Sequence, residues 1–586
     1  MEPITEDIRK HIESLLGQLE DEYYRGIKIS KFYNYKKQMN EGIITEQMID
    51  DIVGQLKSDI ISSRKNEPVS ECAFFAPRRN SSKQNIADII RMNIFPPKDD
   101  SKDAKIKSCT TYQKCLSTLT SQFKEQEFVK LVFKHQFKIS RLSEHRELWE
   151  KLKKRPVSEQ IMNPKAMPVE IATGETLEPF FNYLSSRSAV DPDSILWIPS
   201  EQCMKFTRGA IYTDGRMDLC KQVVGPTHIG KLIDSIRFNP HIKHFLLGNN
   251  IMGTTGCIAI KDFLLNEHTP LIHTWYLAGN DINEEGIKHL VDGLISDPDV
   301  RELWLKRNPI RSQGMKEIQR LLENNQNLIT LDLHNTAVFD EGMEYICTGL
   351  KKNTGVRKLY LDANAIGPKG CDYLIDYFKH IIDTKRIGIT SLWLEMNRID
   401  DDAMIKLITV LGNYQYLERL CIGSNMLSGI SMEAIYHSFK DHKNLIVLDL
   451  GMYKSTADMG EITNRIGLTG SMWISKFIAE NKSIEYLSIL HNDIPEEGIK
   501  NIAEALTVND TIVSLDFKQY FTGIHKDIHQ KIMDKLKFNY QLKGISEAEI
   551  GTYVRELKHT PDIVNIDSIY RNNDKATGPV CVMKHH

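Results

Sequence analysis

The sequence lacks any apolar run long enough to cross a lipid bilayer. A membrane-spanning helix needs about 20 mostly apolar residues, and no such stretch occurs among the 586 residues. The N-terminus, MEPITEDIRKHIESLL, is acidic from its first residues and has no basic segment followed by an apolar core. It therefore does not have the pattern of a secretory signal, and we expect a soluble, cytoplasmic protein with no membrane span. Export by a route that does not use an N-terminal signal stays open.

An excess of charge of either sign is also missing. The chain has 75 Lys and Arg residues against 78 Asp and Glu residues, which gives a net charge of -3. Binding to nucleic acid through the overall field of a protein requires a clear basic excess, so no nucleic-acid partner is expected. The ten cysteines are scattered without C-x2-C pairs, a pattern that favours reduced intracellular thiols over disulfides or a zinc ribbon.

Motifs of nucleotide binding and hydrolysis are absent as well. The sequence has no G-x4-G-K-[ST] loop, no G-x-S-x-G elbow and no H-E-x-x-H helix, so it indicates neither an ATP-driven switch nor common hydrolase chemistry. The histidines between His228 and His289 have no Cys or carboxylate pair at ligand spacing, so they predict no zinc site. We expect no cofactor, no metal, no catalytic residue and a protein that is not an enzyme.

An internal repeat fills the second half of the chain. The frame apolar-x-apolar-x-x-Asn-x-apolar recurs with different fillings, and copies commonly start 28 residues apart, as Leu303, Leu331 and Leu359 do. A repeat of this length indicates a solenoid. The clearest copies are WYLAGNDINEEG (275–286), LWLKRNPIRSQG (303–314), LYLDANAIGPKG (359–370), LWLEMNRIDDDA (392–403) and LSILHNDIPEEG (487–498).

Each copy predicts a short strand followed by a helix. In EEGIKHLVDGLISDPD, for example, Ile287, Leu290 and Leu294 recur at helical spacing. The asparagine at a fixed offset can hydrogen-bond the backbone of the neighbouring coil, so we expect a ladder that satisfies buried polar groups. The predicted ladder consists of Asn250, Asn280, Asn308, Asn364, Asn397, Asn425 and Asn492.

The repeated frame resembles that of leucine-rich repeat proteins, and its 28-residue unit is similar to the ribonuclease-inhibitor-like subclass. The resemblance implies an α/β solenoid of about ten repeats, with a curved parallel sheet inside and helices outside. It does not imply one activity, because the subclass includes ribonuclease inhibitor, Ran GTPase-activating protein and the sensor halves of immune receptors. The expected organisation is a mostly helical N-terminal region of unknown role (1–194), a capping β-hairpin (195–225), the solenoid (226–540), and a C-terminal cap and tail (541–586).

One strand position carries unusually large side chains. Trp304 lies between Leu303 and Leu305, and successive strand residues point to opposite faces, so Trp304 should lie on the concave face if the leucines face the core. We expect the rings of this row to be exposed, about 5 Å apart on adjacent strands and about twice that across Asp332. With the flanking charges, the predicted partner-binding residues are Tyr276, Trp304, Tyr360, Trp393, Arg301, Glu302, Lys306, Arg307, Asp332, Arg357, Lys358 and Glu395.

Exposed aromatic rings among Arg and acidic residues match the composition of protein-binding hot spots. The sequence therefore predicts a protein-protein interaction scaffold or regulator that binds a partner protein on its concave face. Two other uses of the rings stay open: a cover formed by the N-terminal region, or stacking of the rings on one another. Two other functions also stay open: a GTPase activator resembling the Ran class, and an effector or immune-type protein with its activity in the N-terminal region.

Overall fold

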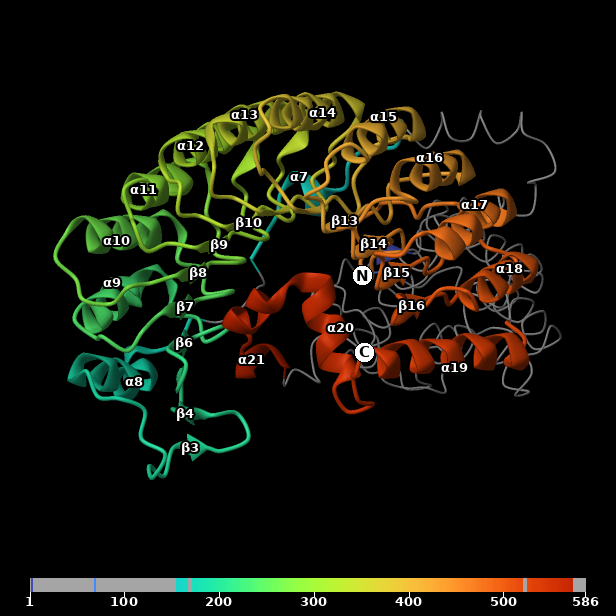
Figure 1. Ribbon diagram of the computed structural model, residues 1–586. Coiled ribbons are helices and arrows are strands. Elements are labelled where there is room, and N and C mark those ends of the chain that lie inside the picture. Colours follow the sequence, from blue (N-terminus) through green and yellow to red (C-terminus); the bar gives the residue numbers. More distant parts are fainter. Residues whose placement is uncertain (1, 4–67, 70–153, 167–170, 520–523, 573–586) are drawn as a thin grey trace. The chain divides into compact units, whose positions relative to one another are not determined.

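The computed structural model describes residues 2–3, 68–69, 154–166, 171–519 and 524–572 (Figure 1). The chain divides into two units, Met1–Lys154 and Arg155–His586. In the first unit the structure describes Lys154 and the antiparallel pair β1 (Glu2–Pro3) and β2 (Pro68–Val69). Most of the predicted helical region 1–194 therefore lies outside the described residues. Its last part belongs to the second unit and contains α7 (Glu159–Met162) and α8 (Gly174–Ser186).

The second unit is built on one 14-stranded sheet, in which the strands follow one another in chain order. The first four strands are antiparallel, and all pairs from β6 to β16 are parallel. The strands are β3 (Trp197–Ile198), β4 (Cys203–Lys205), β5 (Ala210–Tyr212), β6 (Arg216–Asp218), β7 (His244–Leu246), β8 (Thr274–Tyr276), β9 (Glu302–Trp304), β10 (Thr330–Asp332), β11 (Lys358–Tyr360), β12 (Ser391–Trp393), β13 (Arg419–Cys421), β14 (Val447–Asp449), β15 (Tyr486–Ser488) and β16 (Ser514–Asp516).

A helix follows each of the strands from β6 to β16, and these helices form an outer layer around the sheet (Figure 1). The protein thus has the α/β architecture of a leucine-rich repeat solenoid. The helices are α9 (Gly225–Ile236), α10 (Gly253–Leu265), α11 (Glu284–Leu294), α12 (Arg311–Asn324), α13 (Phe339–Lys352), α14 (Pro368–Asp383), α15 (Asp401–Leu411), α16 (Gly429–Phe439), α17 (Gly467–Glu480), α18 (Glu496–Leu506) and α19 (Lys526–Leu542).

The main core lies between the sheet and the helices. Leu303 and Leu305, on either side of Trp304, are fully buried in it together with Ile287 of α11, whereas Trp304 belongs to a second apolar cluster. Neighbouring helices approach closely where one of them carries glycine: a Cβ atom at Gly349 would lie 2.9 Å from a side-chain atom of Leu322. The alternation of strand side chains therefore places Trp304 on the concave face, away from the helices.

A ladder of buried amides joins successive coils at the carboxyl ends of the strands. Asn308, for example, accepts from the backbone N–H of Asn280 at 2.8 Å and donates to the carbonyl of Leu277 at 2.9 Å. All seven asparagines named from the sequence donate to a carbonyl of the preceding coil in this way. Where the sequence frame loses its asparagine, Asn464 and Gln519 take the same place.

A second ladder, which we did not predict, runs along the other end of the helices. Asn353 donates to the carbonyls of Leu322 and Asn325 at 2.8 and 2.9 Å, and its side-chain oxygen accepts from the N–H groups that follow it. Asn325, Asn481 and Asn509 repeat this arrangement, and Asn539 repeats the donation to the preceding coil. Both rows of otherwise unpaired backbone groups are thereby satisfied inside the stack.

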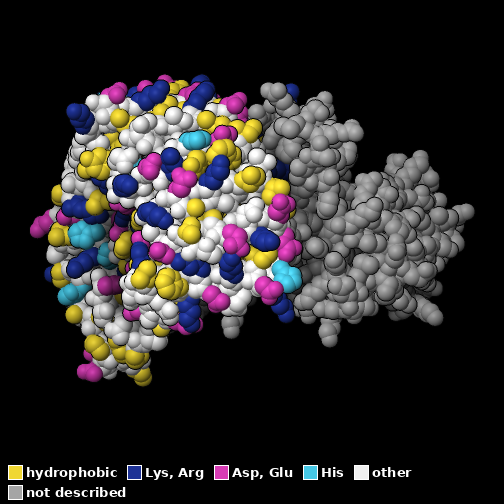
Figure 2. Space-filling view, turned by 45° about the vertical axis from the view of Figure 1, so that its right-hand side comes forward, with side chains coloured by type: hydrophobic (Ala, Val, Ile, Leu, Met, Phe, Trp, Pro, Cys, Tyr) yellow, Lys and Arg dark blue, Asp and Glu magenta, His cyan; other side chains and the backbone are white. Residues whose placement is uncertain are grey.

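The two ends of the stack are closed differently. The hairpin predicted at residues 195–225 corresponds to β5 and β6, which turn at Asp214 and Gly215, and β3 and β4 extend the antiparallel sheet. At the other end α19 packs with Ile532 and Leu536 in the main core. Among the described residues, no helix combines the length and apolar character that a membrane span requires. On the face shown in Figure 2, Lys and Arg side chains are interspersed with Asp and Glu side chains.

Candidate functional site

The concave face carries one aligned row of side chains. Strand pairing places Tyr276 opposite Trp304, Trp304 opposite Asp332, Asp332 opposite Tyr360, and Tyr360 opposite Trp393. These five residues all occupy the third position of their strands, directly after the leucine or tryptophan that faces the helices. The repeat register therefore brings the predicted aromatic residues together on one surface.

The rings contact one another across the aspartate. The ring centroids of Trp304 and Tyr360 lie 5.3 Å apart, so the predicted doubling of the distance across Asp332 is wrong. The short side chain of Asp332, on the strand between them, leaves room for this approach. Tyr360 stacks on Trp393 with centroids 3.8 Å apart and an interplanar angle of 8°, and Tyr276 lies 6.4 Å from Trp304. We call these four rings the aromatic strip; its contacts have geometries that stabilise aromatic pairs.

The prediction that these rings are exposed is wrong. The exposed fraction is 7% for Tyr276, 2% for Trp304, 4% for Tyr360 and 1% for Trp393. Rings that only stacked on one another along an open sheet would keep one side in water, so another part of the chain must cover them.

The cover is formed by residues 550–572, which we call the C-terminal segment. It consists of α20 (Ile550–His559), the 3-10 helix η1 (Pro561–Ile566) and α21 (Ile569–Asn572), and it lies inside the arch of strands (red in Figure 1). Its residues Leu557, Ile563 and Ile566 are buried in the same apolar cluster as the aromatic strip. A covered face was one of the open alternatives, but the cover comes from a stretch that the sequence suggested to be part of a cap and tail.

Polar contacts fix the C-terminal segment along the whole face. They run from β15 to β6, broadly opposite to the order of the repeats, and most strands on the way contribute one side chain. The contacts join Tyr553 to Glu485, the carbonyl of Leu557 to Arg419, Lys558 to Asp449, the carbonyl of His559 to Tyr360, Asp562 to Lys358, Asn565 to Glu302, Ser568 to Asp218, and Arg571 to Tyr276.

Arg571 closes one end of the aromatic strip. Its guanidinium carbon lies 4.5 Å from the centre of the Tyr276 ring, and its Nη1 donates to the Tyr276 hydroxyl at 2.7 Å. An arginine over an aromatic face contributes a cation–π attraction that strengthens when water is excluded. This contact ties the last helix of the segment to β8.

Lys558 enters an acidic pocket at the other end of the strip. Its Nζ lies 2.7 Å from Asp449 Oδ2 and donates to the Tyr486 hydroxyl at 3.1 Å. Burial acts to lower the pKa of Lys558, but the negative charge of Asp449 raises it well above its ordinary value. Burial likewise acts to raise the pKa of Asp449, but Lys558 holds it below its ordinary value. Both groups are therefore charged at neutral pH, as an ion pair.

Further acidic groups surround this pair. Burial, with the charges of Asp449 and Asp362, raises the pKa of Glu395 well above its ordinary range. Burial also raises the pKa of Asp332 to about 6, against the opposing charge of Lys306. These carboxyl groups have too few cations beside them for all to be ionised without cost. No group of residues in the described part of the chain could hold a metal ion.

Of the predicted charged residues, five lie near the C-terminal segment or the acidic pocket and three do not. Glu302 and Lys358 contact the C-terminal segment, and Lys306, Asp332 and Glu395 belong to the buried charges near the acidic pocket. Three arginines are directed elsewhere, to carbonyls of their own loop or to a neighbouring asparagine: Arg301 to Pro298, Arg357 to Gly355, and Arg307 to Asn249.

Several contact residues were missing from the sequence-based set. Asp449 occupies the same strand position as Trp304, so its place on the face could be predicted, but nothing in the sequence connects it with Lys558. Arg419 and Glu485 lie at or just before the first position of their strands, and Asp218 lies in the capping sheet, outside the repeat frame. Their importance follows only from the C-terminal segment that they contact.

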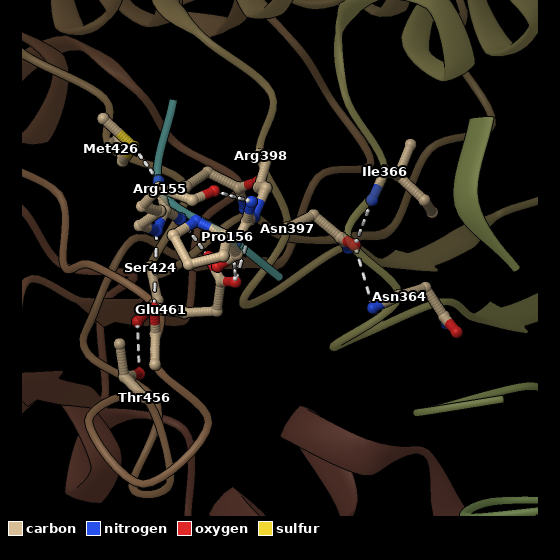
Figure 3. A network of polar contacts seen from close by, with 12 residues as sticks. Arg155, Pro156, Asn364, Ile366, Asn397, Arg398, Ser424, Met426, Thr456 and Glu461 are labelled. Carbon is tan, nitrogen blue, oxygen red and sulfur yellow. Dashed lines mark hydrogen bonds and ion pairs between the residues drawn. The ribbon is translucent and has the colours of Figure 1, made fainter. Parts of the chain in front are cut away.

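A separate polar network lies at the loops that follow the strands (Figure 3). Glu461 is fully buried and pairs with both Arg155 and Arg398. Arg398 also donates to the carbonyls of Arg155 and Pro156 at 2.8 and 3.0 Å. The start of the second unit is thereby fixed to the solenoid. Glu461 belongs to the longest repeat, whose extra loop is also held by a 2.7 Å bond between Thr456 and Ser424.

Comparisons with known proteins give no family assignment. No protein-family model matches the sequence, and no curated protein matches it. Among solved structures, the chain is similar to a yeast complex of Rad7 and Elc1 with 13% identity and a TM-score of 0.34, over 53% of this chain and 70% of that one. It is similar to the internalin InlF of Listeria monocytogenes with 15% identity and a TM-score of 0.29, over 55% and 85%. It is also similar to the actin-binding site 2 of leiomodin-1 with 15% identity and a TM-score of 0.24, over 32% of this chain and 97% of that one.

Proposed function

We propose that this protein is a non-enzymatic interaction scaffold or regulator of the ribonuclease-inhibitor-like class, which binds a partner protein in the cytoplasm through its concave face. The observation that carries the proposal is the C-terminal segment itself. The face holds 23 residues of helical chain (550–572) through aromatic, cation–π and ion-pair contacts. Buried Trp, Tyr and Arg side chains of this kind dominate the energetics of protein-protein interfaces.

The arginines near the loops after the strands favour this function over a GTPase activator. An arginine that completes a GTPase site must be free to reach the nucleotide. Arg398 pairs with Glu461, Arg311 pairs with Glu284, and Arg307 donates to Asn249. Each of these side chains is already engaged within the chain, so the concave face is the better candidate for function.

The test is affinity capture from native cytosol with the full-length chain. Because the C-terminal segment lies on the face, every bait carries Lys558→Glu, which places a carboxylate beside Asp449 and weakens the segment. The second bait adds Trp304→Ala and Trp393→Ala. The control adds Trp473→Ala instead, since Trp473 lies on α17, in the outer layer, beside Tyr436 and Lys476.

We expect one protein to be captured by the first bait and the Trp473→Ala control and to be lost with the double tryptophan variant. Titration of the purified partner should then show a loss of about 2 kcal/mol or more in binding free energy for the double variant. Equal capture by all three folded baits would show that the concave face does not bind the partner.

A further inference from the structure

The C-terminal segment has the character of a ligand as well as that of a cover. We propose that it is a built-in competitor for the concave face, and that the partner protein presents an amphipathic helix whose cationic side chain enters the pocket at Asp449. This inference rests on the protein-binding function proposed above. It adds what the partner looks like and what it must displace.

The charge of the face beneath the segment supports a cover that can leave. A sheet face that is always buried is expected to be apolar, because a charge left unpaired in the interior is costly. Here the covered face carries an ionisable side chain at most of the strands from β6 to β15, and water can solvate each of them when the segment is absent. The six that contact the segment are Glu485, Asp449, Arg419, Lys358, Glu302 and Asp218.

The connection to the rest of the chain also suits a segment that can open. Residues 543–549 join α19 to α20, and all of them except Ile545 are exposed. Gly544 has a positive φ of 78°, and no atom lies within 4 Å of the position that a Cβ would take. The backbone around Gly544 is therefore unobstructed, which suits a hinge between α19 and α20.

The chemistry of the partner follows from the contacts that the segment makes. On α20, Val554, Leu557 and Lys558 recur at helical spacing and lie toward the face, which is the pattern of a helix bound in a groove. The apolar residues meet the aromatic strip, and Lys558 neutralises Asp449 beside Glu395. Since that pocket carries an excess of carboxyl groups, a helix with a lysine or arginine at the corresponding position fits it, and an acidic helix does not.

Hydrogen exchange on the full-length chain tests whether the segment opens by itself. We expect amides of residues 550–559 to exchange through an opening that leaves the strands β7 to β13 protected. Lys558→Glu should speed that exchange by about 30-fold or more, because it breaks a partly buried charge pair. Asp562→Lys, opposite Lys358, is a second variant with the same expected direction. Exchange of the segment only together with the strands, in wild type and both variants, would overturn the proposal.

A peptide of residues 546–572 tests whether the site is shared. The labelled peptide should bind the Lys558→Glu chain more tightly than the wild-type chain, by a factor of about 30 or more in affinity, because the segment of the wild-type chain competes with it. The matched control is the same peptide with Lys558→Glu, which should bind weakly to both. Equal binding of the peptide to both chains would show that the segment does not compete for the face.

The captured partner separates this inference from the proposed function. The peptide is expected to displace the partner, and Asp449→Asn is expected to weaken binding of the partner to the Lys558→Glu chain, because the pocket then has no charge at this position for the partner's cation. A partner that binds the face but is unaffected by the peptide and by Asp449→Asn would overturn the competitor while leaving a protein-binding function in place. If the segment is released but no protein is captured, the proposed protein-binding function is contradicted, and so is the inference that a partner helix takes the place of the segment.

Discussion

The ammonium group of Lys558 lies 2.7 Å from the carboxylate of Asp449 and joins the C-terminal segment to strand β14. Asp449 is 2% exposed, and Lys558 is the cation that holds its pKa low, aided by hydrogen bonds from Gly451 and Ser488. The pair stands at the point where the aromatic strip ends and the acidic groups begin. Its strength therefore decides how firmly the segment covers the face.

A double-mutant cycle measures that strength. Lys558→Met should leave Asp449 with an unpaired charge and raise its pKa, and Asp449→Asn should leave the lysine without its partner. Because each single variant strands one charge, the double variant should cost less than the sum of the two single variants. We expect a coupling free energy of about 2 kcal/mol, measured from the exchange of the amides in α20.

An exposed ion pair provides the matched control for the cycle. Lys537 and Glu547 also join α19 to the residues before α20, with 48% and 76% of their side chains exposed. Exposed pairs contribute little, so the same cycle with Lys537→Met and Glu547→Gln should give a much smaller coupling free energy than the Lys558–Asp449 pair. Equal coupling in the two pairs would mean that the acidic pocket has no special role.

Acid should destabilise the solenoid through two histidines that lie mostly inside the fold. Burial lowers the pKa of both His244 and His491 to about 4. The unfolded chain binds a proton at each near pH 6.5, whereas the folded chain binds it only near pH 4, so the free energy of unfolding falls as the pH drops between these values. Each histidine should account for a loss of about 2 kcal/mol.

Thermal unfolding at pH 7 and pH 5 checks this dependence. His244→Gln and His491→Gln should each flatten the pH profile relative to wild type. Asp332, whose pKa burial raises to about 6, acts in the opposite sense, because the unfolded chain ionises first as the pH rises. The comparison therefore uses each variant against wild type. If the pH profiles of both histidine variants stay parallel to that of wild type, the loss of stability in acid does not come from these two histidines.

The second asparagine ladder should be as important to stability as the first. Asn364→Ala removes bonds to the carbonyls of Leu333 and Leu361, and Asn353→Ala removes bonds to the carbonyls of Leu322 and Asn325. Each substitution leaves buried backbone groups unpaired, so each should lower the free energy of unfolding by about 3 kcal/mol.

Denaturant unfolding, with Asn444→Ala as the control, tests this equality. Asn444 is exposed, and its side chain donates a hydrogen bond to the carbonyl of Gln415 at 2.6 Å. Loss of this bond should lower the free energy of unfolding by less than about 1 kcal/mol. A cost for Asn353→Ala close to that of Asn444→Ala would show that the second ladder is dispensable.

The repeat frame accounts for the local structure, and the contacts between distant segments lie beyond it. The period of Leu303, Leu331 and Leu359 predicts strands, register and the face on which Trp304 lies, because each depends on neighbouring coils alone. The second ladder was also readable, since Asn325 follows Asn308 by 17 residues and Asn509 follows Asn492 by the same interval. The cover could not be predicted from the sequence, because α20 and η1 lie outside the repeats and no repeat spacing relates Lys558 to Asp449. The predicted exposure of the rings failed for this reason.

Tryptophan fluorescence should report directly on release of the cover. Trp304 and Trp393 are 2% and 1% exposed beneath the C-terminal segment, so acrylamide should quench them little in the wild-type chain. Lys558→Glu should increase quenching and shift the emission to longer wavelength, because opening of the segment admits water to both indoles. The increase should vanish in the Trp304→Phe/Trp393→Phe background, since Trp275 remains buried in the main core on the other face of the sheet. An equal increase in that background would mean that Lys558→Glu loosens the solenoid as a whole.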